Sequence, residues 1–329
     1  MRYIYFVTDN PKPSWGIGVI YHHVHELNKA GKNAFIMHQK KGFTINWLSL
    51  TTPVLYYSEE AGRLSANDTL IIPEVMMDLK DIKKIKCRKI VFIQNLFWMF
   101  VNMPEGETHK SLGFEEAMYI MPHILPVIKN RLELPGYLIP PFVAHYFYKK
   151  RDQLHKREKL IVVYPKFSNL DYGILVRFIK ETIKKVNNPS TIRKLLNPSD
   201  QWKLLELTGK SHKEVAAIMQ KAVFFINLNT FEAFNTSVPE AMAAGCINIC
   251  YEAFGPADFL INEENAFVYP NNYVYPLLQK VIDLISNYDA SNETLEAMRI
   301  RARNTADKYT LKDMVFPLLQ YFNDEVAAN

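Results

Sequence analysis

Short hydrophobic runs alternate with longer segments of helical spacing in the first half of the chain. Apolar residues fill positions 3–7 and 34–37, and between them Ile20, Val24 and Leu27 recur along one helix face. This order predicts a strand–helix–strand unit. Three further apolar runs end in polar residues or proline, as buried parallel strands do at the edge that binds ligands; they lie at 70–72, 90–93 and 119–121. The first half is therefore predicted to be a doubly wound parallel sheet.

The pattern changes near residue 140 and then begins again. Ile139-Pro140-Pro141-Phe142 is followed by a charged stretch, 149–159, that has no apolar periodicity, so we expect a linker there. Beyond it, predicted strands alternate with predicted helices, as in a second parallel α/β domain. The expected strands lie at 160–163, 202–207, 223–228 and 247–250, and the expected helices at 171–186, from 211, after 236, at 273–286, 292–307 and 310–323.

Length and composition agree with this two-domain picture. A chain of 329 residues exceeds the size at which one core usually stops growing, and 48% hydrophobic residues are typical of a packed globular protein. The first apolar run is too short for a signal peptide, and no stretch reaches membrane-spanning length. Three cysteines, Cys87, Cys246 and Cys250, form no disulfide or zinc framework, so we expect small buried side chains in a cytoplasmic protein.

Charge narrows the range of partners. A net charge of +5 is mild for this length, so a dedicated nucleic-acid binder is not expected, whereas an anionic ligand or a membrane surface would suit equally well. Two basic clusters, 80–89 and 149–159, offer a peripheral contact with the inner membrane face. Both also contain acids, and a solvated surface is the simpler interpretation.

Two glycines stand between the first predicted strand and the helix that follows it. Gly16 and Gly18 would let backbone amides approach a phosphate or a sugar closely. The segment lacks the third glycine of the G-x-G-x-x-G dinucleotide fingerprint. A ligand-binding loop and an ordinary tight turn both remain open.

The strongest chemical signal follows the predicted strand at 223–228. Glu232 falls in the turn, Glu240 is expected two turns into the next helix, and Thr236 and Ser237 are residue types that cap helix N-termini. An anion on the free amides near this helix start would meet the positive end of the helix dipole. The two carboxylates beside it would then recognise neutral hydroxyl groups of a sugar or ribose.

The segment from Glu232 to Gly245 resembles a known family pattern. Two glutamates with seven residues between them, followed by Pro239-Glu240-Ala241-Met242-Ala243-Ala244-Gly245, look like the motif of retaining GT-B glycosyltransferases of the family-4 type. Further landmarks of that family have counterparts here: Gly209-Lys210-Ser211, the loop 251–256, the segment 265–268 and, more loosely, the Gly16/Gly18 loop and 138–141.

The resemblance implies a fold and a domain division. The expected fold is GT-B: two Rossmann-like α/β domains with doubly wound parallel sheets facing each other across a cleft. Residues 1–145 would form the acceptor-side domain and residues 146–309 the nucleotide-sugar domain. The C-terminal helix, 310–329, would cross back to the first domain.

The resemblance also assigns roles at the site. Glu232 would lie at the donor sugar, Glu240 would hold ribose hydroxyls, and amides near Thr236 and Ser237 would bind the diphosphate. Ala233-Phe234-Asn235 stands where the family has Gly-Phe-Gly against the sugar, so Ala233 and Asn235 add side chains there and donor choice would differ. The remaining expected contacts with the donor or the leaving group come from Lys166, Gln94, Gly209 and Lys210.

These roles predict a retaining, metal-independent glycosyltransferase without a cofactor. Its donor would be a nucleoside-diphosphate sugar, of uridine or guanosine, and its acceptor a hydroxyl of a glycan, a lipid-linked sugar or a small molecule. Two departures from the family keep alternatives open. Lys166 is the one cation expected at the diphosphate, because Tyr172 stands where the family has a lysine, and Gln94-Asn95 replaces the usual histidine. The alternatives are a non-catalytic nucleotide-sugar binder and a nucleotide-sugar epimerase, with DNA glucosylation a minor one.

Other acidic and histidine groups offer weaker hypotheses. No D-x-D pair occurs in the chain, so the metal site of GT-A enzymes is not expected. His22, His23, His25 and Glu26 suggest a metal but form no H-E-x-x-H pattern. His109 with Glu115-Glu116 falls where an acceptor-binding loop or simple solvent exposure is expected.

Overall fold

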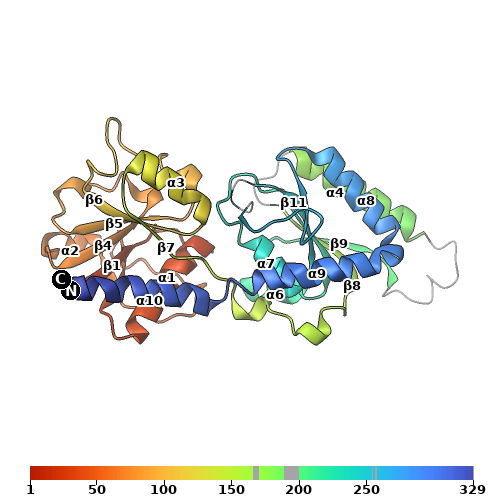
Figure 1. The fold of residues 1–329 in the computed structure, drawn as a ribbon, viewed down its shortest axis with the longest axis horizontal. Coiled ribbons are helices and arrows are strands. Elements are labelled where there is room, and N and C mark those ends of the chain that lie inside the picture. Colours follow the sequence, from red (N-terminus) through yellow and green to blue (C-terminus); the bar gives the residue numbers. More distant parts are fainter. Residues whose placement is uncertain (166–169, 189–199, 254, 256–257, 329) are drawn as a thin grey trace. The chain divides into compact units, whose positions relative to one another are not determined.

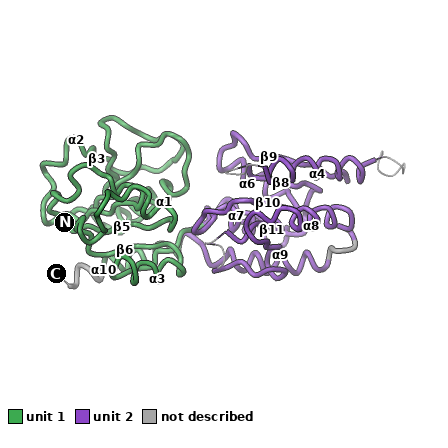
Figure 2. Tube along the Cα trace, turned by 90° about the horizontal axis from the view of Figure 1, so that it is seen from above, with its two compact units in different colours: residues 1–142, 312–329 green, residues 143–311 purple. Residues whose placement is uncertain are grey.

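The computed structural model describes residues 1–165, 170–188, 200–253, 255 and 258–328. The chain divides into two compact units (Figure 2): unit 1 is Met1–Phe142 with Lys312–Asn329, and unit 2 is Val143–Leu311. The expected boundary, between 145 and 146, falls three residues later than this division.

Unit 1 is built on a seven-stranded sheet in the order β3-β2-β1-β4-β5-β6-β7. All its neighbouring strands pair in parallel. The central strands carry the near-continuous hydrophobic runs that two-sided burial requires. The bounds of the seven strands are β1 Arg2–Phe6, β2 Ala34–His38, β3 Val54–Tyr56, β4 Asp68–Pro73, β5 Arg88–Ile93, β6 Phe114–Tyr119 and β7 Gly136–Leu138.

The C-terminal helix α10, Leu311–Ala328, packs on unit 1 from Lys312 onward (Figure 1, dark blue). The ring of Phe322 meets that of Tyr3 in β1 with centroids 4.6 Å apart, and Lys32 Nζ donates to the Phe322 carbonyl at 3.2 Å. The other helices of this unit are α1 Trp15–Lys29, α2 Tyr57–Glu60 and α3 Leu125–Val127.

Unit 2 has a five-stranded parallel sheet in the order β12-β11-β10-β8-β9. Its strands are β8 Glu158–Tyr164, β9 Lys203–Glu206, β10 Ala222–Asn227, β11 Ile247–Tyr251 and β12 Phe267–Tyr269. Its helices are α4 Leu170–Val186, α6 His212–Met219, α7 Ser237–Ala244, α8 Val274–Ser286 and α9 Asn292–Ala306.

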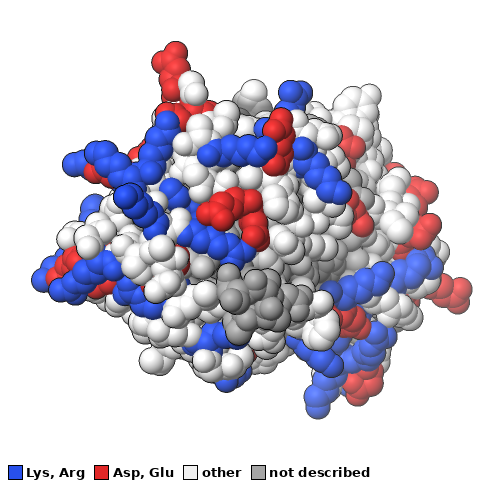
Figure 3. All heavy atoms as spheres, turned by 60° about the vertical axis from the view of Figure 1, so that its left-hand side comes forward, with Lys and Arg blue, Asp and Glu red and all other residues white. Residues whose placement is uncertain are grey.

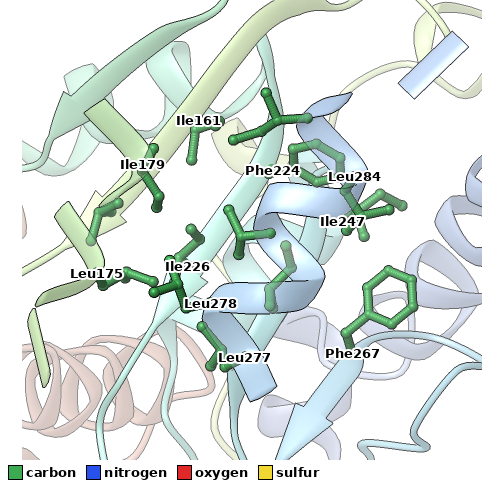
Figure 4. Packing of buried hydrophobic residues seen from close by; sticks show 14 of the residues in the cluster. Ile161, Leu175, Ile179, Phe224, Ile226, Ile247, Phe267, Leu277, Leu278 and Leu284 are labelled. Atoms are coloured by element: carbon green, nitrogen blue, oxygen red, sulfur yellow. The ribbon is translucent and has the colours of Figure 1, made fainter. Parts of the chain in front are cut away.

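One face of the unit 2 sheet packs against α4 and α8 (Figure 4). Phe224 and Ile226 of β10 are fully buried there, and Trp202 stacks on Phe224 with ring centroids 5.6 Å apart. Each such side chain contributes roughly 1.5–3 kcal/mol by leaving water. The core therefore fixes β10 at the centre of the sheet, and α7 begins beyond its carboxyl end.

The long hydrophobic runs predicted their strands, and the short edge strands were missed. β3 and β7 are three residues long and carry no fully buried side chain. β6 lies earlier than the predicted run at 119–121. Its first half was missed because it contains the polar pair Glu115-Glu116, which does not look like a buried strand. The acceptor-loop interpretation of these acids is therefore wrong, whereas the solvent-exposure interpretation holds for Glu115.

Glu116 and His109 are both engaged within unit 1. Glu116 forms an ion pair with Arg88 and accepts a hydrogen bond from Tyr321 Oη at 2.6 Å. His109 is buried, and burial lowers its pKa to about 4. Neither solvent exposure nor a free acceptor loop describes it.

Most side chains of the two basic clusters are exposed, and several of their charges are paired within their own units. In the first, Lys83 pairs with Glu107, and Lys89 is buried with its ammonium donating to two carbonyls at 3.0 Å. On the face drawn in Figure 3, Lys and Arg side chains lie among Asp and Glu side chains. In the second, Arg157 donates to carbonyls of Ala244 and Gln220 at 2.7 Å, so it caps two helix ends. The solvated-surface prediction therefore holds for most side chains of both clusters, with Lys89 and Arg157 as exceptions.

None of the helices among the described residues has the length and apolar character needed to cross a membrane. Cys87, Cys246 and Cys250 are free and buried, as predicted.

Candidate functional site

The candidate site of unit 2 is the junction between β10 and α7. β10 pairs with β8 on one side and β11 on the other, so its carboxyl end lies at the middle of the sheet edge. Nine residues connect its last residue, Asn227, to the first residue of α7, Ser237. Ligands of parallel α/β sheets bind at this kind of edge, in front of a helix N-terminus.

Two backbone amides at the start of α7 are open. Val238 N donates to the Asn235 carbonyl at 2.8 Å and Glu240 N to the Thr236 carbonyl at 3.1 Å. The amides of Thr236 and Ser237 have no acceptor among the described residues. Together with the positive end of the helix dipole, they can hold an anionic oxygen.

The capping prediction for Thr236 and Ser237 is wrong. Thr236 takes the N-cap position with helical angles, φ −46° and ψ −32°, and its side chain makes no capping hydrogen bond. The Ser237 hydroxyl donates instead to Asn235 Oδ1 at 3.0 Å. Because neither side chain covers the helix end, its amides remain available to a ligand.

Asn235 holds the loop in the conformation that precedes the helix. Its φ of 51° lies in the left-handed region, which asparagine adopts more readily than other non-glycine residues. Its side chain is buried, and Oδ1 accepts hydrogen bonds from Asn227 Nδ2 and Ser237 Oγ, both at 3.0 Å. Asn235 Nδ2 and Asn229 Oδ1 have no hydrogen-bond partner in the described part of the chain, so one buried donor and one buried acceptor remain unsatisfied here.

Phe234 holds the same loop in place through aromatic packing. Its buried ring packs against Phe259 and Tyr309, with centroids 5.6 and 4.9 Å apart. That side chain is occupied by packing, so a substrate contact at this position would come from the backbone.

Gly255 fastens a second loop to the one that carries Glu232. Gly255 N donates to the Glu232 carbonyl at 3.0 Å, and a Cβ on Gly255 would lie 1.6 Å from the Ala233 carbonyl oxygen. No side chain larger than hydrogen fits there without moving a backbone segment. Glu232 itself is partly buried in this junction. The sequence showed the 251–256 loop as a landmark but gave no sign of this contact.

Glu240 is buried in the first turn of α7, one turn earlier than predicted, and lies beside two residues that were not predicted. His212 Nε2 lies 2.6 Å from Glu240 Oε1, and Tyr146 Oη lies 2.6 Å from His212 Nδ1. Burial raises the pKa of the Glu240 carboxyl, while His212 opposes that shift. Tyr146, His212 and Glu240 are 66 and 28 residues apart, so no local pattern could have grouped them.

Gly209 and Lys210 form the turn that leads to His212. Gly209 has φ 61°, and Ser211 is the N-cap of α6, with a capping box in which Glu214 takes part. The Lys210 side chain is exposed. This turn determines where α6 starts and therefore where His212 meets Glu240.

In unit 1, Gly16 and Gly18 lie inside the first turn of α1, which begins at Trp15. The expectation of a turn before the helix is therefore corrected. Gln94, just past β5, donates from Nε2 to the Gly16 carbonyl at 3.2 Å, and a Cβ on Gly16 would lie 2.6 Å from Gln94 Oε1. Gly16 and Gln94 thus come together at the carboxyl edge of this sheet, whereas Gly18 packs close to the Trp15 ring.

A buried carboxyl group lies beside Gln94 and was missed. Glu74 follows β4 and accepts a hydrogen bond from Asn95 N at 2.8 Å through Oε1. Its Oε2 is buried without a partner among the described residues, and burial raises the pKa of Glu74 to about 7. A glutamate directly after a hydrophobic strand was the one signal in the sequence that could have pointed to it.

Lys166 and Tyr172 are the two positions at which the family resemblance raised the question of a cation. Lys166 lies outside the described residues, so its place in the site stays a prediction. Tyr172, which stands where the family has a lysine, donates its hydroxyl to Glu206.

The histidine group of α1 is dispersed. His23 is buried against the rings of Tyr5 and Phe92, and His25 Nδ1 lies 3.4 Å from the Thr51 carbonyl. No three His, Cys, Asp or Glu side chains in the described ranges are grouped so that they could hold a metal ion.

Comparison with known proteins agrees with this geometry. Residues 187–305 match the family model described as Glycosyl transferases group 1, and this span contains the β10–α7 junction. An alpha-1,6-glucosyltransferase of Actinobacillus pleuropneumoniae is 25% identical over 270 residues, which cover 76% of this chain and 73% of that protein.

Solved structures extend the likeness to the whole chain. Sucrose-phosphate synthase of Thermosynechococcus elongatus superimposes with a TM-score of 0.71 at 11% identity, over 100% of both chains. HepE of Anabaena, in complex with UDP-glucose, gives 0.66 at 10% identity, over 98% of this chain and 100% of that one. The predicted GT-B fold of two parallel-sheet α/β domains is thereby confirmed, and residues 187–305 of the second unit are similar to the Glycosyl transferases group 1 family.

Proposed function

We propose that this chain is a retaining, metal-independent glycosyltransferase that moves a sugar from a nucleoside-diphosphate sugar to a hydroxyl acceptor. The observation that carries the proposal is the α7 start, where the open amides of Thr236 and Ser237 lie between Glu232 and Glu240. Amides suit a diphosphate, and carboxylates suit hydroxyl groups. A nucleoside-diphosphate sugar presents both in one molecule.

Each group then has a task in the reaction. The Thr236 and Ser237 amides hold the diphosphate, Glu240 accepts hydrogen bonds from ribose hydroxyls, and Glu232 contacts the donor sugar. During transfer the bond between the sugar C1 and the diphosphate oxygen breaks, and a bond from C1 to the acceptor oxygen forms on the same face. The acceptor proton passes to the departing diphosphate, whose growing charge the helix amides and Lys166 stabilise.

The relatives suggest which donor to test first. One is an alpha-1,6-glucosyltransferase, and HepE has been crystallised with UDP-glucose. The pneumococcal O-GlcNAc transferase GtfA, crystallised with UDP and GlcNAc, has a TM-score of 0.56 with this chain at 13% identity. UDP-glucose and UDP-GlcNAc are therefore the first donors, ahead of GDP-sugars, with glycan, lipid-linked and small-molecule acceptors.

The test is acceptor-dependent release of nucleoside diphosphate by the purified chain, with and without a chelator. Glu240→Ala should weaken nucleotide binding about tenfold or more, because a charged hydrogen bond to ribose is lost. Glu232→Gln should chiefly lower turnover. Glu181→Ala, on the exposed face of α4, is the matched control and should change neither. Unchanged nucleotide affinity in Glu240→Ala would contradict the ribose assignment.

Two other functions share the donor site. A non-catalytic nucleotide-sugar binder is favoured by Tyr172, which replaces a cation, and by Gln94 in place of histidine. Donor-induced thermal stabilisation without turnover on any acceptor would support it. An epimerase would convert the donor sugar in the absence of acceptor, which product analysis of donor-only incubations detects.

The proposal includes a cytoplasmic setting. The free thiols of Cys87, Cys246 and Cys250 suit a reducing compartment. A peripheral contact with the inner membrane face gains little from the basic clusters, because several of their charges are paired within the unit. Co-sedimentation with anionic vesicles measures it directly.

A further inference from the structure

A hydrogen-bonded row of three side chains ends at Glu240. Tyr146 lies in a short 3-10 helix, His145–Phe147, His212 is the first residue of α6, and Glu240 is in the first turn of α7. The two heavy-atom separations, Tyr146 Oη to His212 Nδ1 and His212 Nε2 to Glu240 Oε1, are both 2.6 Å. These are short for hydrogen bonds, and all three residues belong to unit 2.

The imidazole is held on several sides. Its ring meets the Phe147 ring edge to face with centroids 4.8 Å apart, and the Tyr146 ring at 5.5 Å. Gln220, just past the end of α6, donates to the Tyr146 carbonyl at 2.8 Å and so fixes the backbone that carries both aromatic rings. The orientation of His212 is thus determined by packing as well as by its two hydrogen bonds.

The protonation of Tyr146, at one end of the row, determines which atoms donate and which accept in its two hydrogen bonds. Burial raises the pKa of Tyr146 to about 12, so its hydroxyl keeps its proton and can donate to His212 Nδ1. A neutral imidazole that accepts at Nδ1 carries its hydrogen on Nε2. That hydrogen points at Glu240 Oε1, so a carboxylate is the form of Glu240 that completes the row.

We propose that His212 is a positioning residue for ribose recognition: it occupies Glu240 Oε1 and so presents Oε2 to a ribose hydroxyl, with Tyr146 setting the ring. This inference rests on the proposed function, because it assumes that a nucleotide binds at the start of α7. No hydrogen bond to Glu240 Oε2 is formed by the described residues, whereas Oε1 is engaged. A carboxylate fixed through one oxygen discriminates hydroxyl positions better than one that can rotate.

The experiment compares ribonucleotides with their deoxy counterparts on the full-length chain. Dissociation constants are measured by calorimetry for UDP, GDP, ADP and CDP, and for the 2′-deoxy and 3′-deoxy forms of the one that binds tightest. The variants are Glu240→Gln, His212→Ala, His212→Gln and Tyr146→Phe. His155→Gln, an exposed histidine of the same unit, is the control. Thermal unfolding of each variant shows whether unit 2 remains folded.

The wild type and the control should prefer the ribonucleotide over at least one deoxy form by roughly tenfold or more. His212→Ala should reduce that ratio to within about threefold of unity, mostly by weakening the ribonucleotide. His212→Gln, whose amide can still donate to Glu240, should recover part of the ratio, and Tyr146→Phe should lose less than His212→Ala.

Two results overturn the proposal. If His212→Ala weakens ribo and deoxy forms equally, or leaves the ratio at the wild-type value, the histidine has only a structural role. If no nucleoside diphosphate binds the wild type, the proposed function fails and this inference fails with it. Binding with ribose preference in the wild type and in His212→Ala alike would leave the proposed function standing and refute the inference alone.

Discussion

Asn235 offers a quantitative test of how the α7 start is held. Its backbone has φ 51°, and its buried Oδ1 accepts hydrogen bonds from Asn227 Nδ2 and Ser237 Oγ. Two substitutions separate these features. Asn235→Ala and Asn235→Gly both remove the amide, but only alanine keeps a Cβ in the left-handed region.

The magnitudes follow from the contacts. Without Oδ1 the half-buried Ser237 hydroxyl and the buried Asn229 Nδ2 both lose their acceptor, whereas Asn227 Nδ2 keeps Ser237 Oγ at 2.7 Å. The buried amide group of Asn229 is then left unsatisfied, at a cost of about 1–3 kcal/mol. Alanine at positive φ adds about 1–2 kcal/mol. Glycine avoids that strain but gains unfolded-state entropy worth about 0.4–1 kcal/mol. Asn235→Gly should therefore be the more stable of the two variants by about 0.5–1 kcal/mol.

The assay must report unit 2 alone, because a two-unit chain need not unfold in one step. Hydrogen exchange of a peptide covering β10 measures the free energy of opening this sheet in each variant. The account is refuted if the alanine variant is as stable as the glycine variant. It is also refuted if both lie within about 0.5 kcal/mol of the wild type, since such surface-like values would mean that the polar group contributes nothing.

Three further outcomes are expected. Burial raises the pKa of Glu74 from 4.5 to about 7, so the folded unit holds this proton more tightly than the unfolded chain does. The free energy of unfolding is therefore highest below pH 4.5, and this contribution is lost as pH rises through 7. Glu74→Gln should stabilise unit 1 at pH 8 by up to about 3 kcal/mol and by nothing at pH 4, measured by urea unfolding. Gly245→Ala should cost about 2 kcal/mol or more by hydrogen exchange, because the methyl group meets both φ 84° and a guanidinium nitrogen 1.9 Å away. Gly209→Ala, with φ 61° and open space, is its control and should cost about 1 kcal/mol. Gly255→Ala should lower turnover more than nucleotide affinity, since it separates the two loops at Glu232 while leaving α7 in place; equal losses in initial-rate and binding assays would contradict this.

The sequence predicted the elements that bury continuous hydrophobic runs. All the long strands and helices of unit 2 lie within a few residues of their expected bounds, because each carries enough apolar side chains to show its period. β3 and β7 could not be predicted, since an edge strand of three partly covered residues has no period to detect. Their pairing is determined by the neighbouring strand rather than by their own composition.

The site was predicted only where its residues are close in sequence. Glu232 and Glu240 sit on one turn and one helix, and their spacing was visible directly. His212 contacts Glu240 and Tyr146 contacts His212, each from another element, and nothing in their own neighbourhoods distinguishes them from surface residues. Arg157 was misplaced for a related reason: a charged stretch predicts solvent, although this guanidinium is held by helix-end carbonyls.

The departures from the family pattern affect binding and turnover differently. At Asn235 a left-handed backbone is kept by a residue that tolerates it, and the amides of Thr236 and Ser237 stay open, so the proposed anion site does not need the glycine that the family has there. Tyr172 gives no such compensation, because its hydroxyl is bonded to Glu206 and supplies no positive charge. Ground-state binding of a diphosphate can rely on helix amides, whereas a leaving group that gains charge depends on every nearby cation. Weak catalysis in this chain should therefore appear as a low turnover number with ordinary nucleotide affinity, and Tyr172→Lys should raise turnover several-fold without tightening UDP binding to the same extent.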